Sequence, residues 1–242
     1  SNGKRGDDAG WYRLFNDGRP AGCFGDWRTG FSRTWQADFG RALTRAEHAT
    51  HQAKVRAMRR EREAAEARLR VEAQERAVAI WETASPDPDD HAYLIRKGIK
   101  AHGARLYKDA LVIPVRANGL IHSLQFIGVD GDKRFLGGGR VAGCYFSIGN
   151  PRGASALCIA EGFATGATIH EATGYPVAVA FNAGNLLSVA KAMREKFSDL
   201  TLILCADDDR ETPGNPGLTK ATEAARAVRG LLVSPKFMKV TA

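Results

Sequence analysis

Two short apolar segments, each followed at once by carboxylates, constrain the fold of this chain more than any other feature. Residues 156–160 read ALCIA before Glu161, and residues 202–206 read LILCA before Asp207, which lies 46 positions after Glu161. Continuous apolar runs of this length are typical of strands that are buried on both faces of a parallel sheet. The ligand crevice of such a sheet lies at the carboxyl ends of its strands. The sequence therefore predicts that Glu161, Asp207 and Asp209 project into one crevice.

The crowding of these acids predicts a bound cation. Carboxylates that are held close together repel one another unless a cation lies between them. Hard divalent cations prefer oxygen ligands, so Mg²⁺ is expected, with Mn²⁺ as the alternative. Asp207 and Asp209 lie two residues apart and are expected to be the primary ligands, while Asp208 points away or reaches the metal through water.

The last third of the chain alternates between strand and helix signals. Four strands are predicted, at residues 157–160, 176–181, 200–206 and 231–234. Three helices are predicted between them, at residues 164–173, 185–197 and 218–228, with Asn185 as the cap of the second. A βα alternation of this kind predicts a parallel sheet that is covered by helices.

The Glu-Gly pair after one strand and the Asp-x-Asp group after another resemble the Toprim domain. Bacterial-type DNA primases, type IA and type II topoisomerases and some nucleases share that domain. The resemblance is strongest over residues 155–235, where residues 160–166 (AEGFATG) and 205–210 (CADDDR) look most like primases of conjugative plasmids and phages. Either motif alone is a weak signal, but both together, in this order and on buried strands, are a much stronger one.

The resemblance implies an α/β fold: a Toprim domain with a Rossmann-like, mainly parallel sheet, preceded by a small β-rich subdomain and a long helix. It also implies catalysis by Glu161, Asp207 and Asp209. In Toprim enzymes the matching glutamate is taken as a general acid/base or as a metal ligand, so Glu161 is expected in either role. The implied metal ligands are Glu161, Asp207, Asp208 and Asp209.

The first 84 residues predict a small sheet followed by a long helix. Strands are expected at residues 11–15, 21–24 and 31–36, with a hairpin turn at residues 16–18. Aromatic and basic residues interleave here, as in proteins that stack single-stranded bases on aromatic rings, although a small sheet also needs aromatics for its core. Residues 41–84 contain neither Pro nor Gly and are rich in Ala, Arg and Glu, which predicts a long exposed helix.

Residues 85–150 predict a second β-rich unit. A short helix that starts with an Asp cap is expected at residues 89–96, followed by strands at residues 111–116, 121–128, 133–136 and 143–148. Its IPV and KRFL segments are similar in order and spacing to the region before the Toprim domain of bacterial primases. The implied contacts with template or nucleotide come from Arg116, Lys133, Arg134 and Arg140, for which ordinary surface positions are the alternative. Thr219 and Lys220 are expected to bind triphosphate, because a helix N-terminus favours anions.

These predictions divide the chain into five parts. They are a β-meander at residues 1–40, a long charged helix at 41–84, a β-rich primase subdomain at 85–150, a Toprim catalytic domain at 151–235 and a tail at 236–242. The basic excess lies mainly in the first two thirds: residues 1–84 carry 16 Lys and Arg against 12 Asp and Glu, whereas residues 151–242 carry 10 against 9.

The composition narrows the possible partners and settings. The formal net charge of +8 favours a polyanionic partner. The four cysteines form no Cys-x-x-Cys motif, so neither a zinc site nor a disulfide framework is expected. No membrane-spanning run, signal peptide or phosphate-binding P-loop motif is found, so no membrane partner and a cytoplasmic setting are expected.

The leading hypothesis is a DNA primase that makes short RNA primers on single-stranded DNA in plasmid or phage replication or conjugation. Single-stranded DNA and ribonucleoside triphosphates are the implied partners, and a replicative helicase is a further candidate. The alternatives are a Toprim nuclease or topoisomerase and a non-catalytic fragment that binds single-stranded DNA. Two features of many primases, a third acidic motif after the last strand and a zinc ribbon, are not found, so the sequence is expected to be a fragment.

Overall fold

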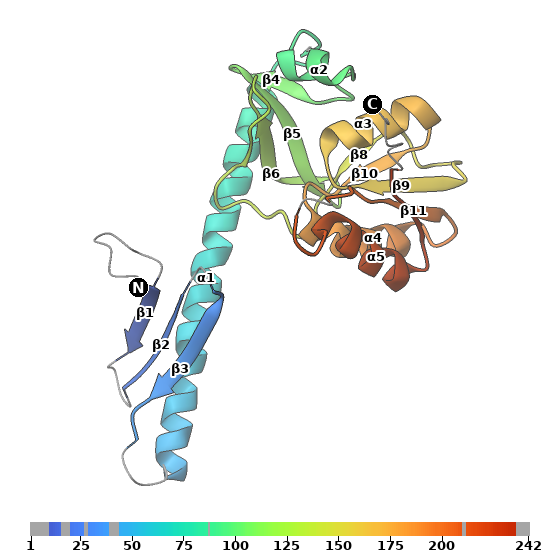
Figure 1. The fold of residues 1–242 in the computed structure, drawn as a ribbon. Coiled ribbons are helices and arrows are strands. Elements are labelled where there is room, and N and C mark those ends of the chain that lie inside the picture. Colours follow the sequence, from blue (N-terminus) through green and yellow to red (C-terminus); the bar gives the residue numbers. More distant parts are fainter. Residues whose placement is uncertain are drawn as a thin grey trace. The chain divides into compact units, whose positions relative to one another are not determined.

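The computed structural model describes residues 10–15, 20–26, 29–38, 44–86, 88–209 and 212–235. The chain divides into two compact units, residues 1–64 and residues 65–242, and the division falls inside helix α1 (Arg45–Thr83) (Figure 1). No helix among the described residues combines the length and the apolar character that crossing a membrane requires.

The first unit contains the expected meander. Strands β1 (Gly10–Phe15), β2 (Ala21–Asp26) and β3 (Phe31–Gln36) form an antiparallel sheet in the order β1-β2-β3, which confirms the predicted strands. The predicted turn at residues 16–18 lies outside the described residues.

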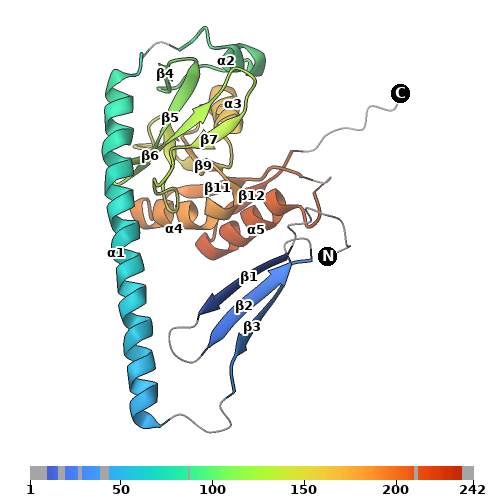
Figure 2. The ribbon, with the colours of Figure 1, turned by 90° about the vertical axis from the view of Figure 1, so that its left-hand side faces the viewer.

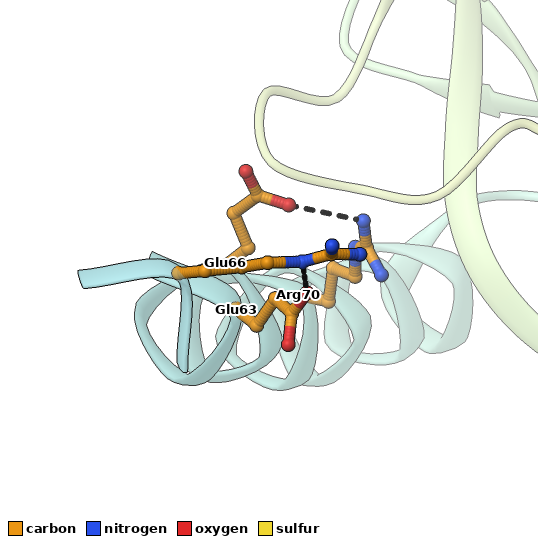
Figure 3. A network of polar contacts seen from close by, with 4 residues as sticks. Glu63, Glu66 and Arg70 are labelled. Atoms are coloured by element: carbon orange, nitrogen blue, oxygen red, sulfur yellow. Dashed lines mark hydrogen bonds and ion pairs between the residues drawn. The ribbon is translucent and has the colours of Figure 1, made fainter. Parts of the chain in front are cut away.

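The long helix α1 begins with a capping box. The Thr44 hydroxyl accepts from the Glu47 backbone N–H at 3.3 Å, and the Glu47 carboxylate accepts from the Thr44 backbone N–H at 2.8 Å. Along the helix, exposed i,i+4 ion pairs join Arg59 to Glu63 at 2.8 Å and Glu66 to Arg70 at 3.5 Å (Figure 3). Because these pairs are exposed to solvent, each contributes little to the stability of the helix.

The C-terminal part of α1 packs on the second unit's antiparallel sheet. Ala73 and Ala77 are fully buried, and Ala77 packs with Val112 and Leu124 of that sheet. Small side chains let the helix approach closely, and a Cβ added to Gly138 would lie 3.5 Å from the Ala73 Cβ. This half of the predicted helix is therefore a packed element rather than a solvated one.

The sheet against α1 has the order β4-β5-β6-β7. Its strands are β4 (Arg105–Tyr107), β5 (Ala110–Ala117), β6 (Leu120–Ile127) and β7 (Lys133–Phe135). Three of these strands were predicted, but β4 was not. The helix before it, α2 (Ala92–Lys97), is capped by buried His91, whose Nδ1 accepts from the Tyr93 N–H at 3.3 Å. The prediction of an Asp cap at the start of this helix was wrong.

The remaining residues form the expected α/β domain. Strands β8 (Phe146–Ile148), β9 (Ala156–Ala160), β10 (Val177–Val179), β11 (Thr201–Cys205) and β12 (Leu231–Val233) pair in the order β12-β11-β9-β10-β8. The last four strands are parallel and β8 is antiparallel to β10, which confirms a mainly parallel sheet. The helical elements are α3 (Phe163–Thr173), the 3₁₀ turn η1 (Ala183–Asn185), α4 (Leu186–Lys196) and α5 (Pro216–Val228).

The helices cover both faces of this sheet (Figure 1). Phe163 of α3 belongs to the same buried cluster as Val177 and Val179 of β10. Helices α4 and α5 lie side by side and bury the other face, which carries Ile159 and Leu204 (Figure 2). Because β9 and β11 are buried from both sides, their apolar runs end only where the chain leaves the sheet.

Asn185 has a different role from the predicted one. Its side chain makes no cap hydrogen bond to α4 and is 4% exposed. The amide nitrogen donates to the carbonyls of Cys144 at 2.8 Å, Ala180 at 2.9 Å and Val141 at 3.2 Å, and the amide oxygen accepts from the Gly143 N–H at 2.8 Å. Asn185 therefore ties the loop before β8 to the end of β10.

Replacing Asn185 with alanine should lower the free energy of unfolding by about 3 kcal/mol, because buried backbone groups then lose their partner. Urea unfolding followed by circular dichroism measures this. Asn150→Ala, in an exposed turn, is the matched control and should cost less than about 1 kcal/mol. Equal losses in the two variants would contradict the bridging role.

Candidate active site

The predicted acids lie at the carboxyl ends of two neighbouring strands. Glu161 directly follows β9, and Asp207 follows β11 after one residue. The two strands are paired in parallel, with Cys205 opposite Ala160, so both acids leave the sheet at the same end. The structure thus brings Glu161 and Asp207 together, as the sequence predicted.

Both acids line a cavity of about 330 Å³. Its acidic wall is formed by Glu161 and Asp207. Basic residues line the same cavity: Arg96 and Lys97 of α2 and Lys133 of β7. Tyr93, Asp130, Gly131, Gly162, Ala164, Thr165 and Phe181 complete the lining. The cavity therefore offers cationic side chains that suit phosphate and carboxylates that suit a hard cation.

The electrostatic environment of Glu161 is the most strained in the cavity. Burial raises the pKa of Glu161, and the charges of Asp207 and Asp209 raise it further, whereas a hydrogen bond from the Ala183 backbone and the charge of Lys133 oppose these effects. Among the described residues, the buried Oε2 of Glu161 has no hydrogen-bond partner. Burial and Asp209 also raise the pKa of Asp207, against the opposing charge of Lys133. The site thus holds more negative charge than its protein neighbours neutralise.

The metal-free protein should lose stability as the pH rises. The folded-state pKa values of Glu161 and Asp207 lie above their ordinary values of 4.5 and 3.8, so the folded state binds more protons than the unfolded state. The free energy of unfolding therefore falls as the pH rises from the ordinary values through the raised ones. In EDTA, Glu161→Gln should flatten this fall above pH 4.5, the ordinary value for Glu161, and raise the thermal midpoint at the upper end of the pH range.

Thermal unfolding of both proteins across this range checks the prediction. Glu195→Gln, on the exposed face of α4, is the control and should follow the wild type. A lower thermal midpoint for Glu161→Gln than for the wild type at the upper end of the pH range would contradict a destabilising charge on Glu161.

The loop that carries Asp208 and Asp209 is braced by Asn215, the cap of α5. The Asn215 side chain accepts from the Asp209 N–H at 3.0 Å and donates to the Asp208 carboxylate at 2.9 Å. The Asp209 carboxylate in turn accepts from the Gly217 N–H at 3.3 Å. Asp208 is thus directed toward Asn215, and Asp209 toward the start of α5. Sequence reasoning missed Asn215, although an Asn before Pro216 is a typical helix-start signal.

The acids suit a hard cation, although they are not closed around one. No group of three or more His, Cys, Asp or Glu in the described part of the chain is arranged as a complete metal site. Two observations still fit a cation: the unpartnered Oε2 of Glu161, and the burial and neighbouring carboxylate charge that raise the pKa values of Glu161 and Asp207. A donor set made only of carboxylate oxygens favours Mg²⁺ or Mn²⁺ over softer metals.

Of the four basic residues expected to contact nucleotide or template, only Lys133 lies in this cavity. The Arg134 guanidinium lies over the Phe126 ring at 5.3 Å. The Arg140 Nε donates to the Cys144 Sγ at 3.4 Å, and the Arg116 guanidinium lies over the Trp81 ring at 5.5 Å. Arg116, Arg134 and Arg140 therefore do not line this cavity.

Thr219 and Lys220 already have local partners. The Thr219 hydroxyl donates to the Gly214 carbonyl at 2.8 Å, and the Lys220 ammonium pairs with Glu223 at 2.9 Å. The first-turn N–H groups of α5 are also in use, because Gly217 donates to Asp209 and Leu218 donates to Asn215. This helix start therefore supports the acid loop, and the reason given for triphosphate binding there does not hold.

Sequence reasoning also missed the contribution of α2. Tyr93, Arg96 and Lys97 line the cavity, and the Arg96 guanidinium is fixed by a 2.9 Å bond to the Val129 carbonyl. The local signal was weak, since Arg and Lys before a glycine are ordinary at a helix end. Only the tertiary fold brings residues of α2 into the cavity at the strand ends.

One family model matches the last third of the chain, and curated relatives match nearly all of it. Residues 155–237 match the family model of the Toprim domain. Over 97% of its length the chain is 37% identical to a protein of Escherichia coli named DNA primase TraC, of which it covers 23%. A second Escherichia coli protein of that name is 35% identical over 97% of this chain, which covers 17% of it. The chain thus spans less than a quarter of these curated relatives.

Two solved structures are also similar to parts of the chain. A DNA primase domain from Pseudomonas aeruginosa has a TM-score of 0.36 and 13% identity, over 56% of this chain and 45% of that one. The DnaG catalytic core has a TM-score of 0.34 and 16% identity, over 57% of this chain and 46% of that one.

Proposed function

We propose, from the premise that residues 155–237 are a Toprim domain, that this chain is part of a DNA primase. The activity would be the synthesis of short RNA primers on single-stranded DNA by metal-dependent nucleotidyl transfer. The observation that carries the proposal is the cavity in which Glu161 and Asp207, on paired parallel strands, face Lys133. Similarity to the two TraC primases over nearly the whole chain supports the same activity.

The residues of the cavity have distinct roles in this proposal. Asp207 and Asp209 would hold Mg²⁺ or Mn²⁺, with Glu161 as third ligand or as general acid/base and Asp208 held back by Asn215. When bound, the cation supplies charge neutralisation between the attacking 3′-oxygen and the leaving pyrophosphate. Burial and the neighbouring carboxylates raise the pKa of Glu161, which favours a role in accepting and returning a proton. Lys133 would pair with nucleotide phosphates.

The remaining partners belong to the same proposal. They are a single-stranded DNA template and ribonucleoside triphosphates, with a replicative helicase as a further candidate. The setting would be the cytoplasm, in plasmid or phage replication or conjugation. Arg116, Arg134, Arg140, Thr219 and Lys220 remain candidate contacts with template or nucleotide outside the acid cavity, and the five-part domain division remains a proposal.

Primer synthesis with labelled ribonucleotides on single-stranded DNA, in Mg²⁺ or Mn²⁺, tests the function. Short RNA products are expected from the wild type and from Glu195→Gln, and about 100-fold less product from Glu161→Gln. Metal-dependent cleavage of the template without RNA products would point to a nuclease instead. DNA binding with neither activity would leave a non-catalytic binding fragment and overturn the proposal for this chain.

A further inference from the structure

The strand register of the meander gives its sheet one aromatic face. Side chains on neighbouring positions of a strand point to opposite faces, and opposed residues on paired strands share a face. Tyr12 is opposite Phe24, and Phe24 is opposite Arg33, so these three form a row across the sheet. The residues other than glycine that share this side, here called the aromatic face, are Tyr12, Leu14, Phe24, Asp26, Phe31, Arg33 and Trp35. Asp26 lies at the end of the face, opposite Phe31, and its carboxylate accepts from the Thr29 N–H at 3.3 Å.

The rings of the aromatic face are open to solvent. Tyr12 is 84% exposed, and Trp35, Phe31 and Phe24 are 50%, 48% and 46% exposed. Exposed large rings that gather on one face of a sheet mark an interaction surface, because water solvates them poorly.

Trp11 lies on the opposite face and, unlike the four exposed rings, packs against the sheet. It is partly buried, and its ring lies against buried Gly25, where an added Cβ would come within 2.8 Å of two ring carbons. The explanation that the aromatics serve as the core of the sheet therefore holds for Trp11. It does not hold for the four exposed rings.

The spacing of the aromatic face suits the bases and phosphates of a single strand. Along β3, Phe31, Arg33 and Trp35 alternate, so two rings flank a guanidinium at steps of about 6.6 Å, two residues of a strand. The Phe24 and Phe31 rings lie 6.2 Å apart in a tilted arrangement. Aromatic rings stack on any base, while arginine binds phosphate or stacks on a base itself.

The charge of this unit favours nucleic acid over a protein partner. Residues 1–64 carry 13 Lys and Arg against 8 Asp and Glu, a composition that attracts a polyanion. The three strands contain no Val or Ile, and Leu14 is the one aliphatic side chain among the seven non-glycine residues of the aromatic face. A surface with rings and arginine but little aliphatic area is typical of single-strand binders.

We propose that the aromatic face binds single-stranded nucleic acid, with bases stacked on Tyr12, Phe24, Phe31 and Trp35 and phosphate held by Arg33. The site is distinct from the acid cavity, and its chemistry requires neither a nucleotide nor a divalent cation. This proposal rests on the proposed function in one respect: the template of the primase would be a single strand of this kind. Because binding is measured without nucleotide or divalent cation, a failure to bind can be told apart from a failure of primer synthesis.

Fluorescence anisotropy of the whole 242-residue chain with a labelled oligothymidylate of about 16 nucleotides, in EDTA and without nucleotides, tests the proposal. Trp35→Leu and Tyr12→Ser should each weaken binding about 10-fold, the usual effect of losing one stacking ring. Trp35→Tyr should restore most of the affinity, because it restores a ring. The matched control is Phe15→Leu, a 40% exposed ring on the opposite face, which should change the affinity by less than about twofold.

The outcomes separate stacking from folding. Tyr12 is so exposed that its replacement does not disturb the sheet, so Tyr12→Ser remains informative if Trp35→Leu unfolds the meander. Wild-type affinity in Tyr12→Ser and Trp35→Leu, or equal losses in Phe15→Leu, would overturn the proposal. Failure of the wild type to bind the oligonucleotide, or self-association of the chain through this face, would overturn it as well. If the variants bind as expected but the wild type makes no primers, the result would count only against the proposed function.

Discussion

Replacing Asp207 with asparagine should lower primer synthesis on single-stranded DNA by about 100-fold or more. The substitution keeps the shape of the side chain and removes the charge that lies beside Glu161 at the strand ends. A metal held by carboxylates loses most of its affinity when a primary ligand becomes neutral. The measurement is the yield of short RNA under saturating ribonucleotides and Mg²⁺ or Mn²⁺.

Asp199→Asn is the matched control for this variant. Asp199 is an exposed residue just before β11, and its carboxylate accepts from the Ser198 hydroxyl at 3.1 Å, away from the cavity lining. It should leave primer synthesis within about twofold of the wild type. Comparable activity in Asp207→Asn and the wild type would remove the strand-end acids from the mechanism.

Replacing Gly217 with alanine should lower primer synthesis about 10- to 100-fold and destabilise the fold by about 1–3 kcal/mol. An added Cβ would lie 2.6 Å from the Asp207 carbonyl oxygen and 2.9 Å from an Asp209 carboxylate oxygen. Backbone oxygen cannot move away cheaply, so either α5 or the acid loop must shift. Helix propensity alone predicts the opposite effect on stability, because alanine in place of glycine in a helix raises the free energy of unfolding by about 0.5–1 kcal/mol.

Two measurements decide between these signs: urea unfolding and the RNA yield of the variant. Gly137→Ala is the control, because nothing lies within 4 Å of the Cβ that it would add. It should change neither quantity appreciably. A Gly217→Ala protein that is more stable than the wild type and fully active would contradict the close packing of α5 on the acid loop.

The strand ends were predictable because their signal is local. A run such as residues 156–160 is apolar on every position, and it stops at a charge, so strand, burial and crevice follow from one segment. The βα alternation then accounts for parallel pairing of β9 and β11. Because Glu161 and Asp207 directly follow these strands, their proximity followed from the same pattern.

The basic wall of the cavity was harder to predict because its residues come from distant elements. Lys133 was proposed together with Arg134 from one segment, but neighbouring positions of a strand face opposite ways, and only Lys133 lines the cavity. Lys97 lies in a short helix far from the acids in sequence. Sequence periodicity indicates which residues share a face, but not which elements meet across a cavity.

Buried polar side chains produced the other errors. Asn185 precedes a helix and was predicted as a cap, yet it is enclosed by backbone groups from two other segments. An Asp cap was expected for α2, and its cap is instead the buried His91. In both cases the local pattern gave the position of the helix correctly, while the partner of the side chain depended on tertiary contacts.

Binding of Mn²⁺ to the whole metal-free chain, followed by electron paramagnetic resonance of the free ion, tests the acid centre most directly. Saturable binding is expected for the wild type and for Asp199→Asn, with affinity reduced about 10-fold or more in Asp207→Asn and Glu161→Gln. Such a pattern would place the cation at the ends of β9 and β11. No saturable binding by the wild type, or equal binding by all four proteins, would contradict a metal centre built from Glu161, Asp207 and Asp209.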